Sequence, residues 1–186
     1  SLSRLEREDA ALTWTDFDIC ELFREAVIRR VNDLERKQMD VVCAFAEDPL
    51  YVHADRDRIE QVVVNLLDNA IKFTPEKGCI ELCAVKEGRT CRMEVRDNGI
   101  GIAEEDRSRI FERFFTVDRA HTSGKGTGLG LSICQRILQM HGESIRLLDT
   151  DCGAAFAFTL KAGEEKARKA SSAAEHADAT DDMNPV

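Results

Sequence analysis

The sequence predicts an α+β fold, a two-layer α/β sandwich in which a mixed, mostly antiparallel sheet is covered on one face by three helices. One observation is that segments with apolar residues at helical spacing are interspersed with shorter segments in which apolar and polar residues alternate. A second is the composition of the 186 residues, 43% hydrophobic and 33% charged, which is typical of a globular domain with its own core.

The chain divides into three parts. Residues 1–9 carry Leu2 and Leu5 at helical spacing and are interpreted as the end of a longer, preceding helix. Residues 10–162 contain the expected domain. Residues 163–186 hold almost no large apolar side chain, so they cannot bury enough surface to order themselves and are predicted to be a disordered tail.

The domain is expected to begin with a strand and a long helix. Residues 12–19 alternate between apolar and polar side chains, which favours a strand. Asp18 can cap a helix over about residues 19–38, because its carboxylate can accept from a free N–H of the first turn. The buried face of this helix is expected to include Leu22, Ala26, Val27, Ile28, Val31 and Leu34.

Two short strands follow at residues 41–46 and 50–54, and Asp55 caps a second helix that Pro75 brings to an end near residue 73. The remaining elements are expected in this order: a hairpin of residues 79–85 and 91–97, a short helix over 103–112, a polar, glycine-rich loop over 116–128, a helix over 130–140, and strands at 144–148 and 154–160.

Net charge and cysteine usage exclude some classes of partner. The formal net charge of −9 argues against nucleic acid or an anionic membrane as a partner. No apolar run approaches the roughly 20 residues that span a bilayer, and the charged start shows no signal peptide. The odd number of seven scattered cysteines indicates reduced thiols that act as small core residues, and the pair Cys79 and Cys83 lacks the companions of a metal site.

The first candidate site is the helical segment IEQVVVNLLDNAIKFTP, residues 59–75. Asn65, Asn69 and Lys72 fall on one stripe beside its apolar face. Asparagine is a poor helix former, so two of them one turn apart need a reason. Amide oxygens can ligate a hard cation such as Mg²⁺, and the lysine can meet a phosphate. The alternative is a solvated helix face.

The second candidate is RDNGIGI, residues 96–102. A strand delivers Asp97, and Gly99 and Gly101 allow a tight loop with close ligand approach. An ionised carboxylate only accepts hydrogen bonds, so Asp97 would favour the exocyclic amine of adenine over the carbonyl of guanine. The alternative is an ordinary turn between two elements.

The third candidate is SGKGTGLGLSI, residues 123–133, in which every second residue from Gly124 to Gly130 is glycine directly before an amphipathic helix. Successive N–H groups and the helix N-terminus can face a chain of phosphates, which Lys125 could reach. The alternative is a flexible linker. Just upstream, IFERFF places Phe111 and Phe114 as expected core residues at the base of the loop.

In this order and spacing, NLLDNAIKFTP, DNGIGI, FERFF and GTGLGLSI resemble the N, first-glycine, F and second-glycine boxes of the histidine kinase catalytic domain. That family shares the Bergerat fold with gyrase, mismatch-repair ATPases and a heat-shock chaperone. The resemblance covers roughly residues 10–162. The opening LSRLE also resembles the end of the second helix of the dimerisation and histidine-phosphotransfer domain.

The resemblance implies the ligands and the residues that hold them. It implies ATP and Mg²⁺ as cofactors. Asn69 and Asn65 are implied to be the metal ligands, and Asn65, Asn69 and Lys72 are implied to be the catalytic residues. Residues 116–128 are implied to form a mobile ATP lid. Asn65, Asn69 and Lys72 are also implied to contact ATP. The other implied contacts are Phe73, Asp97, Gly99, Gly101, Ile102, Lys125, Gly126, Thr127, Gly128, Leu129, Gly130 and Leu131.

The implied activity is transfer of the ATP γ-phosphate to a histidine of the attached dimerisation domain, within a two-component phosphorelay that includes a response regulator. A cytoplasmic position is implied, with a soluble or a membrane-anchored parent as alternatives. The acceptor motif is missing, because none of His53, His121, His141 and His176 has the expected context. The chain is therefore expected to bind ATP without phosphorylating itself.

Two other functions compete with this one. An ATPase of the gyrase or chaperone type resembles the chain, but those relatives place a glutamate, the base that activates water, where Asn65 stands, and an amide cannot accept a proton at neutral pH. A non-catalytic ATP-sensing module stays open. Thr116 departs from the family pattern, because many relatives carry arginine directly after the F box.

Overall fold

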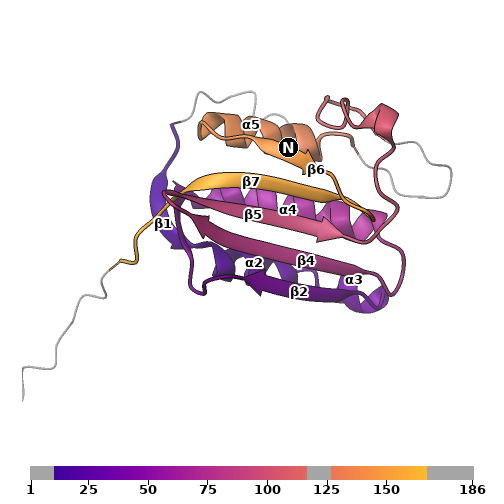
Figure 1. The fold of residues 1–186 in the computed structure, drawn as a ribbon, viewed down its shortest axis with the longest axis horizontal. Coiled ribbons are helices and arrows are strands. Elements are labelled where there is room, and N and C mark those ends of the chain that lie inside the picture. Colours follow the sequence, from indigo (N-terminus) through magenta and orange to yellow (C-terminus); the bar gives the residue numbers. More distant parts are fainter. Residues whose placement is uncertain (1–10, 117–126, 167–186) are drawn as a thin grey trace, which may run out of the picture.

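The computed structural model describes residues 11–116 and 127–166 (Figure 1). The predicted helix end over residues 1–9 and most of the predicted loop and tail lie outside these ranges. Within them, none of the helices combines the length and the apolar character needed to cross a membrane.

The elements follow the predicted order closely. The first half contains β1 (Trp14–Asp18), α2 (Ile19–Ile28), α3 (Val31–Arg36), β2 (Asp40–Phe45), β3 (Tyr51–Asp55) and α4 (Arg56–Phe73). The second half contains β4 (Cys79–Glu87), β5 (Thr90–Asp97), the 3₁₀ turn η1 (Glu104–Asp106), α5 (Gly130–Met140), β6 (Ile145–Leu148) and β7 (Ala155–Ala162).

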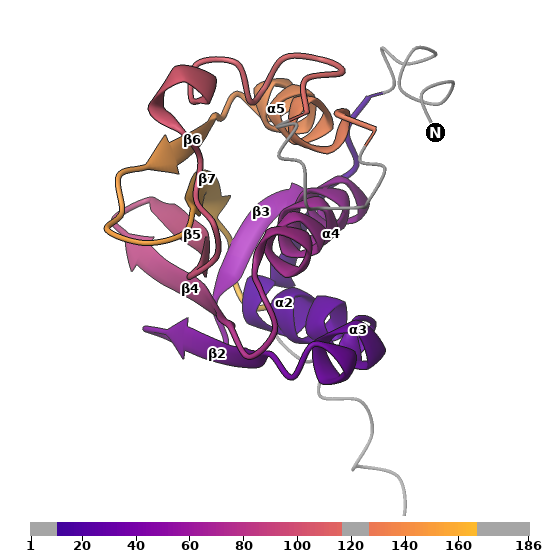
Figure 2. The ribbon, with the colours of Figure 1, turned by 90° about the vertical axis from the view of Figure 1, so that its right-hand side faces the viewer.

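The strands form one mixed sheet in the order β1-β3-β7-β5-β4-β2, and β6 pairs with β7. Among the described strand pairs, β2 and β4 are parallel and the others are antiparallel. The helices lie together on one side of this sheet (Figure 2). The predicted α+β class with a mostly antiparallel sheet is therefore confirmed.

The helix face predicted for residues 59–75 forms the centre of the core. Its apolar side chains are all buried between α4 and the sheet: Ile59, Val62, Val63, Leu66, Leu67, Ala70 and Ile71. The two predicted caps are also present, because Asp18 accepts from the N–H of Cys20 and Asp55 accepts from the N–H of Arg58. These contacts fix where α2 and α4 begin.

The single helix predicted over residues 19–38 is wrong, since α2 ends at Ile28 and α3 begins at Val31. Ile28 and Val31, expected on the buried face, are 69% and 43% exposed. Both are β-branched, which weakens helix propensity at the junction. The break also lets Arg30 reach across to α4, where its guanidinium bonds both carboxylate oxygens of Asp68. Within residues 11–116 and 127–166, four α-helices thus stand in place of the expected three.

The helix predicted over residues 103–112 is likewise replaced, by η1 and further turns. The N–H groups of Asp106, Arg107, Arg109 and Glu112 each bond to the carbonyl three residues back. Phe111 packs against the core, but Phe114, predicted to do the same, is 67% exposed and Phe115 packs there instead. The cause is local: Phe114 has φ 65, a left-handed conformation that turns its side chain outward.

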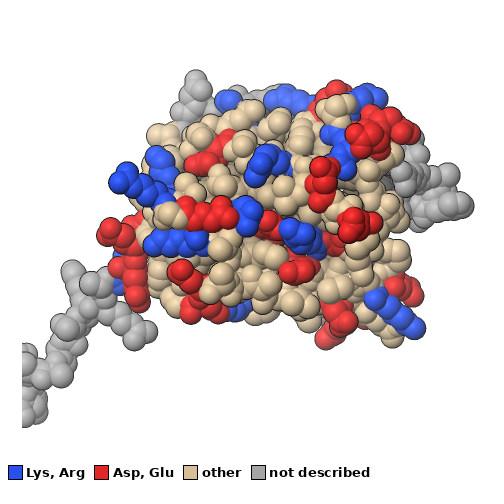
Figure 3. All heavy atoms as spheres, viewed as in Figure 1, with Lys and Arg blue, Asp and Glu red and all other residues tan. Residues whose placement is uncertain are grey.

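The uncovered face of the sheet is charged rather than apolar, with basic and acidic side chains interspersed (Figure 3). At its centre, Glu94 keeps only 7% of its side chain exposed, between Arg92 at 3.4 Å and Arg96 at 2.6 Å. All seven cysteines are free thiols. Three are buried as predicted, but Cys43 and Cys152 are exposed.

Candidate functional site

The predicted stripe on α4 is present on the helix surface. Asn65, Asn69 and Lys72 are each partly buried. The side-chain Nδ2 of Asn65 donates to the main-chain oxygen of Gly130 at 3.4 Å, which leaves its Oδ1 directed to other partners. The Lys72 ammonium lies 5.1 Å from the ring centroid of Phe73, one residue on. Amide oxygens and a cation are thus brought together along one side of the helix.

The loop after β5 holds Asp97 by its main chain and its side chain. Its N–H donates to Ala154 O at 2.9 Å, and its Oδ1 accepts from Gly99 N at 2.9 Å and from Ala154 N at 3.2 Å. Burial raises the pKa of this carboxyl, although the two main-chain hydrogen bonds oppose the shift. Because both bonds from the described residues go to Oδ1, Oδ2 is free to accept from a ligand.

Gly99 closes this loop against the C-terminal end of α4. A Cβ on Gly99 would lie 2.2 Å from Phe73 O, which accepts from Ile100 N at 3.1 Å. No side chain fits at that distance, so glycine is required there. The loop that carries Asp97 is therefore held against the C-terminal end of α4, the helix that carries Asn65, Asn69 and Lys72.

Sequence reasoning missed two neighbours of Asp97 on the strand β7 side. Gly153 has φ +65, and a Cβ on it would lie 1.9 Å from Asp97 O. Ala154 supplies the N–H and the carbonyl that fix Asp97. The signal was a lone glycine directly before a predicted strand, which often marks a close backbone approach.

Lys37 was missed as well, and nothing in its local sequence marks it. Its ammonium donates to the main-chain oxygens of Ile71 and Thr74 at the C-terminal end of α4. Burial lowers the pKa of this lysine. A cation is favourable at a helix C-terminus, so Lys37 stabilises the last turn, which carries Lys72 and Phe73.

The described part of the third glycine segment lies at the start of α5. Gly128 has φ +66, and a Cβ there would lie 2.6 Å from the main chain of Phe114, whose N–H donates to Gly128 O at 2.9 Å. Thr127 and Leu129 flank it, and Gly130 and Leu131 form the first turn, beside Asn65. Lys125 and Gly126, also predicted to bind ligand, lie outside the described residues.

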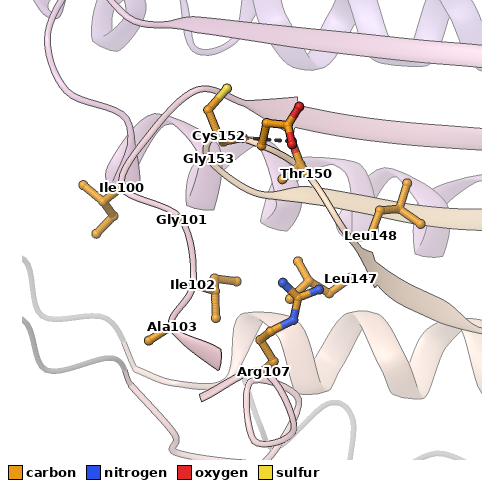
Figure 4. Close-up of a pocket in the computed structure, with 11 residues that line it drawn as sticks. Ile100, Gly101, Ile102, Ala103, Arg107, Leu147, Leu148, Thr150, Cys152 and Gly153 are labelled. Carbon is orange, nitrogen blue, oxygen red and sulfur yellow. Dashed lines mark hydrogen bonds between the residues drawn. The ribbon is translucent and has the colours of Figure 1, made fainter. Parts of the chain in front are cut away.

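Ile102 packs against the core and also lines a pocket of about 310 Å³ on another side of the same loop (Figure 4). The pocket lies between residues 100–107 and the turn between β6 and β7, where Thr150 donates to Cys152 O. No residue of α4 lines it. The pocket is therefore distinct from the space beside Asn65, Asn69 and Lys72. Gly101 and Ile102, which were predicted to bind ligand, line the pocket.

The two described histidines lie away from these residues. His53 on β3 bonds to Asp16 at 2.8 Å and stacks on Trp14. His141 is buried, with Nδ1 donating to Ile137 O at 2.7 Å and Nε2 accepting from Asp55 N at 3.1 Å. Both have structural partners, so neither is placed to react.

The arrangement suits a ligand that has an N–H donor at one end and anionic groups with a bound cation at the other. A carboxylate oxygen at Asp97 can accept from a ligand N–H, and the amides of Asn65 and Asn69 can hold a hard cation. Lys72 and the N-terminus of α5 favour anionic groups.

Comparison with known proteins agrees with this arrangement. Residues 54–164 match the family described as "Histidine kinase-, DNA gyrase B-, and HSP90-like ATPase". The chain is 34% identical over 161 residues to the sensor histidine kinase RcsC of Escherichia coli strain K12, which is 86% of this chain and 17% of RcsC. The chain thus spans about a sixth of that relative's length.

Solved structures give the same result. A nucleotide-free catalytic domain of the histidine kinase ThkA matches with a TM-score of 0.73 and 35% identity, over 81% of this chain and 98% of that one. ThkA in complex with the response regulator TrrA matches with 0.71 and 32%, over 86% and 48%. Full-length ShkA in complex with AMPPNP matches with 0.74 and 28%, over 89% and 34%.

Proposed function

Because the chain belongs to the histidine kinase-, DNA gyrase B- and HSP90-like ATPase family, we propose that it is the ATP-binding catalytic domain of a two-component sensor histidine kinase. The proposed domain spans residues 10–162, and residues 1–9 are assigned to a preceding dimerisation domain. The reaction is transfer of the ATP γ-phosphate to a histidine of that dimerisation domain. The observation that carries the proposal is Asp97, fixed by Gly99 and Ala154 in a loop that closes against Phe73 at the end of α4.

At the base end, Asp97 selects adenine. Its Oδ2 accepts from the exocyclic amine, and guanine offers a carbonyl at the same position, so the carboxylate would face another acceptor. Gly99, Gly101 and Ile102 give the base room to approach, and Phe73 packs beside it.

At the phosphate end, Asn65 and Asn69 direct amide oxygens to a bound Mg²⁺, and Lys72 meets a phosphate. The engagement of Asn65 Nδ2 by Gly130 fits this role, because it orients the oxygen rather than the NH₂ group outward. Thr127, Gly128, Leu129, Gly130 and Leu131 present the start of α5 to the phosphates. Asn65 and Asn69 would hold the Mg²⁺ ion, which would supply positive charge to neutralise the phosphates.

Asn65 favours transfer over hydrolysis. A hydrolase needs a base that removes a proton from water, and an amide does not accept one at neutral pH. In place of water, the acceptor is the histidine of the dimerisation domain, and a response regulator receives the phosphoryl group next. The complex of ThkA with the response regulator TrrA supports a partner of this kind.

Calorimetry tests the binding half of the proposal. We expect ATP to bind in the micromolar-to-millimolar range, more tightly with Mg²⁺ than without it, and clearly more tightly than GTP. Equal affinity for ATP and GTP would contradict the role of Asp97.

A transfer assay tests the other half. The chain is incubated with γ-labelled ATP, alone and together with a dimerisation domain that carries the acceptor histidine. Acid-labile, base-stable label is expected on that domain and not on this chain, and joining the two in one polypeptide should raise the rate through the effective concentration. Label on His53, His121, His141 or His176 at a comparable rate would refute the division of roles.

A further inference from the structure

Strand β2 forms an open edge of the sheet. Among the described residues it hydrogen-bonds along its length to β4 alone. In this parallel pair, Asp40 N donates to Gly78 O and Ala46 N donates to Ala84 O, both at 3.0 Å. The bonds of a parallel pair use every second residue, so the peptide groups of Val41, Cys43 and Phe45 point away from β4. Figures 1 and 2 show no other described element along this edge.

The edge lacks the usual protection against strand pairing. Edge strands are commonly kept single by charged side chains, proline or bulges. The opposite edge, β1, carries two aspartates, Asp16 and Asp18, within five residues. In β2, no charged residue lies between Asp40 and Glu47, and Val42 is 50% exposed. Cys43 and Ala44 are exposed as well.

From this edge we infer that β2 is a self-association surface, on which β2 of a second copy of the chain pairs antiparallel about a two-fold axis at Cys43. In this register Val41 lies opposite Phe45 of the second copy, and Cys43 lies opposite its own counterpart. All three outward-facing residues of each strand then exchange N–H and C=O groups. A shift by two residues in either direction leaves one of the three outside the pairing, so the centred register satisfies the most hydrogen-bonding groups.

The side chains suit the same register. Val42 lies beside Ala44 of the second copy, on the uncovered face of the sheet. On the helix-covered face, Val41 meets Phe45, an aromatic against a β-branched residue, which is a favourable cross-strand pair. The acidic residues at the ends of the strand do not oppose one another, because Asp40 faces Ala46 and Glu47 faces Met39. A chain with net charge −9 can therefore pair here without placing like charges in contact.

The association is expected to be weak on its own. Two six-residue edges bury less than the roughly 1,000 Å² of a stable interface, so dissociation in the range of about 0.1–1 mM is expected. Pairing becomes substantial when two copies are held close together. The inference uses no residue of the nucleotide site and is independent of the proposed function.

Oxidative cross-linking of the chain tests this register. The Cα atoms of a directly opposed, hydrogen-bonded antiparallel pair lie about 5.5 Å apart, which is within the range that a disulfide spans. Under mild copper-phenanthroline oxidation, we expect a Cys43–Cys43 dimer at a yield about tenfold above that of Cys152–Cys152, where Cys152 serves as the exposed thiol outside the edge. Sedimentation equilibrium of the reduced chain at high concentration should show reversible self-association.

Ala44→Lys places a charge on the exposed edge and should abolish both signals. Val31→Lys is the matched control, because it adds the same charge at an exposed apolar position on α3, outside the β2 edge, and it should leave both signals unchanged. Three results would overturn the inference: a monomer at all concentrations, a Cys43 cross-link no more frequent than that of Cys152, or a cross-link that survives Ala44→Lys. A dimer that both lysine variants weaken equally would reflect net charge and would also overturn it.

Discussion

The two ends of the proposed nucleotide site differ in how firmly the chain itself holds them. Around Asp97, three main-chain hydrogen bonds between 2.9 and 3.2 Å and two glycine contacts closer than any side chain permits fix the carboxylate. Around Asn65, the side-chain amide donates to Gly130 O at the start of α5 through a long bond of 3.4 Å and also contacts the thiol of Cys134. The Lys72 ammonium lies over the face of Phe73.

The groups around Asp97 are therefore held in place before a ligand binds, whereas the groups around Asn65 and Lys72 are free to bind one. Groups that are already held in place lose little freedom when a ligand arrives, so the base end can discriminate between bases at low cost. Groups with few internal bonds are available to a cation and to phosphates. Substitutions at the base end should therefore change both folding and binding, and substitutions at the phosphate end should change binding alone.

Gly153→Ala should have the largest effect. Its Cβ would lie 1.9 Å from Asp97 O at a φ of +65, so the loop must shift and the fold should lose about 3 kcal/mol, together with ATP binding. Urea unfolding measures the loss. The control is Gly142→Ala, at φ +74 with no atom within 4 Å, which should cost only about 1 kcal/mol. Equal costs would show that the contact with Asp97 is unimportant.

Asp97→Asn comes next and should weaken ATP binding by about 2 kcal/mol, roughly 30-fold, because an amide can present a donor to the adenine amine. The ratio of ATP to GTP affinity should fall by a similar factor. Calorimetry with both nucleotides measures it. If the ratio stays as in the wild type, base selection depends on other groups.

Asn69→Ala should weaken Mg²⁺-dependent ATP binding by about 1.4 kcal/mol, roughly tenfold, while unfolding free energy stays the same or rises slightly, since alanine is the better helix former. Asp68→Ala, at the neighbouring position, removes the partner of Arg30 and should leave ATP affinity unchanged. A loss of stability in Asn69→Ala would mean that the phosphate end is as firmly built as the base end.

The pH dependence should be the smallest effect. Burial raises the pKa of Asp97 above its ordinary value of 3.8, so the folded chain holds this proton more tightly than the unfolded chain. Stability should therefore fall as pH rises from 3.8 through the raised value. ATP affinity should rise over the same window, because only the carboxylate accepts from adenine. The difference between wild type and Asp97→Asn, by urea unfolding and calorimetry, isolates both trends.

The order of the elements and the α4 stripe could be predicted, because the periodicity of a helix or a strand is visible within a short stretch of consecutive residues. Asp97 could be found for the same reason, as the end of an alternating segment followed by two glycines. The break between α2 and α3 could not, because the β-branched Ile28 and Val31 weaken helix propensity only slightly, and the contact that the break allows joins Arg30 to Asp68, 38 positions away in the chain.

The surroundings of Asp97 show the same limit. Gly153 and Ala154 reach it from a strand 57 residues later, and only the pairing of β5 with β7 brings them together. Phe114 failed for a different reason. In IFERFF, the prediction of Phe111 as a core residue was correct and that of Phe114 was wrong, because a left-handed turn at Phe114 exchanges the roles of Phe114 and Phe115.

His141 ties the end of α5 to the beginning of α4, since one ring nitrogen bonds within α5 and the other accepts from the N–H of Asp55. The opposite end of α5 meets α4 at Asn65, through the long bond to Gly130. The two helices are thus pinned together at one end and lightly joined at the other. If the imidazole keeps both bonds, we expect a widening of the gap between Asn65 and Gly130 to turn α5 about His141, so that the start of α5 moves while its end stays fixed.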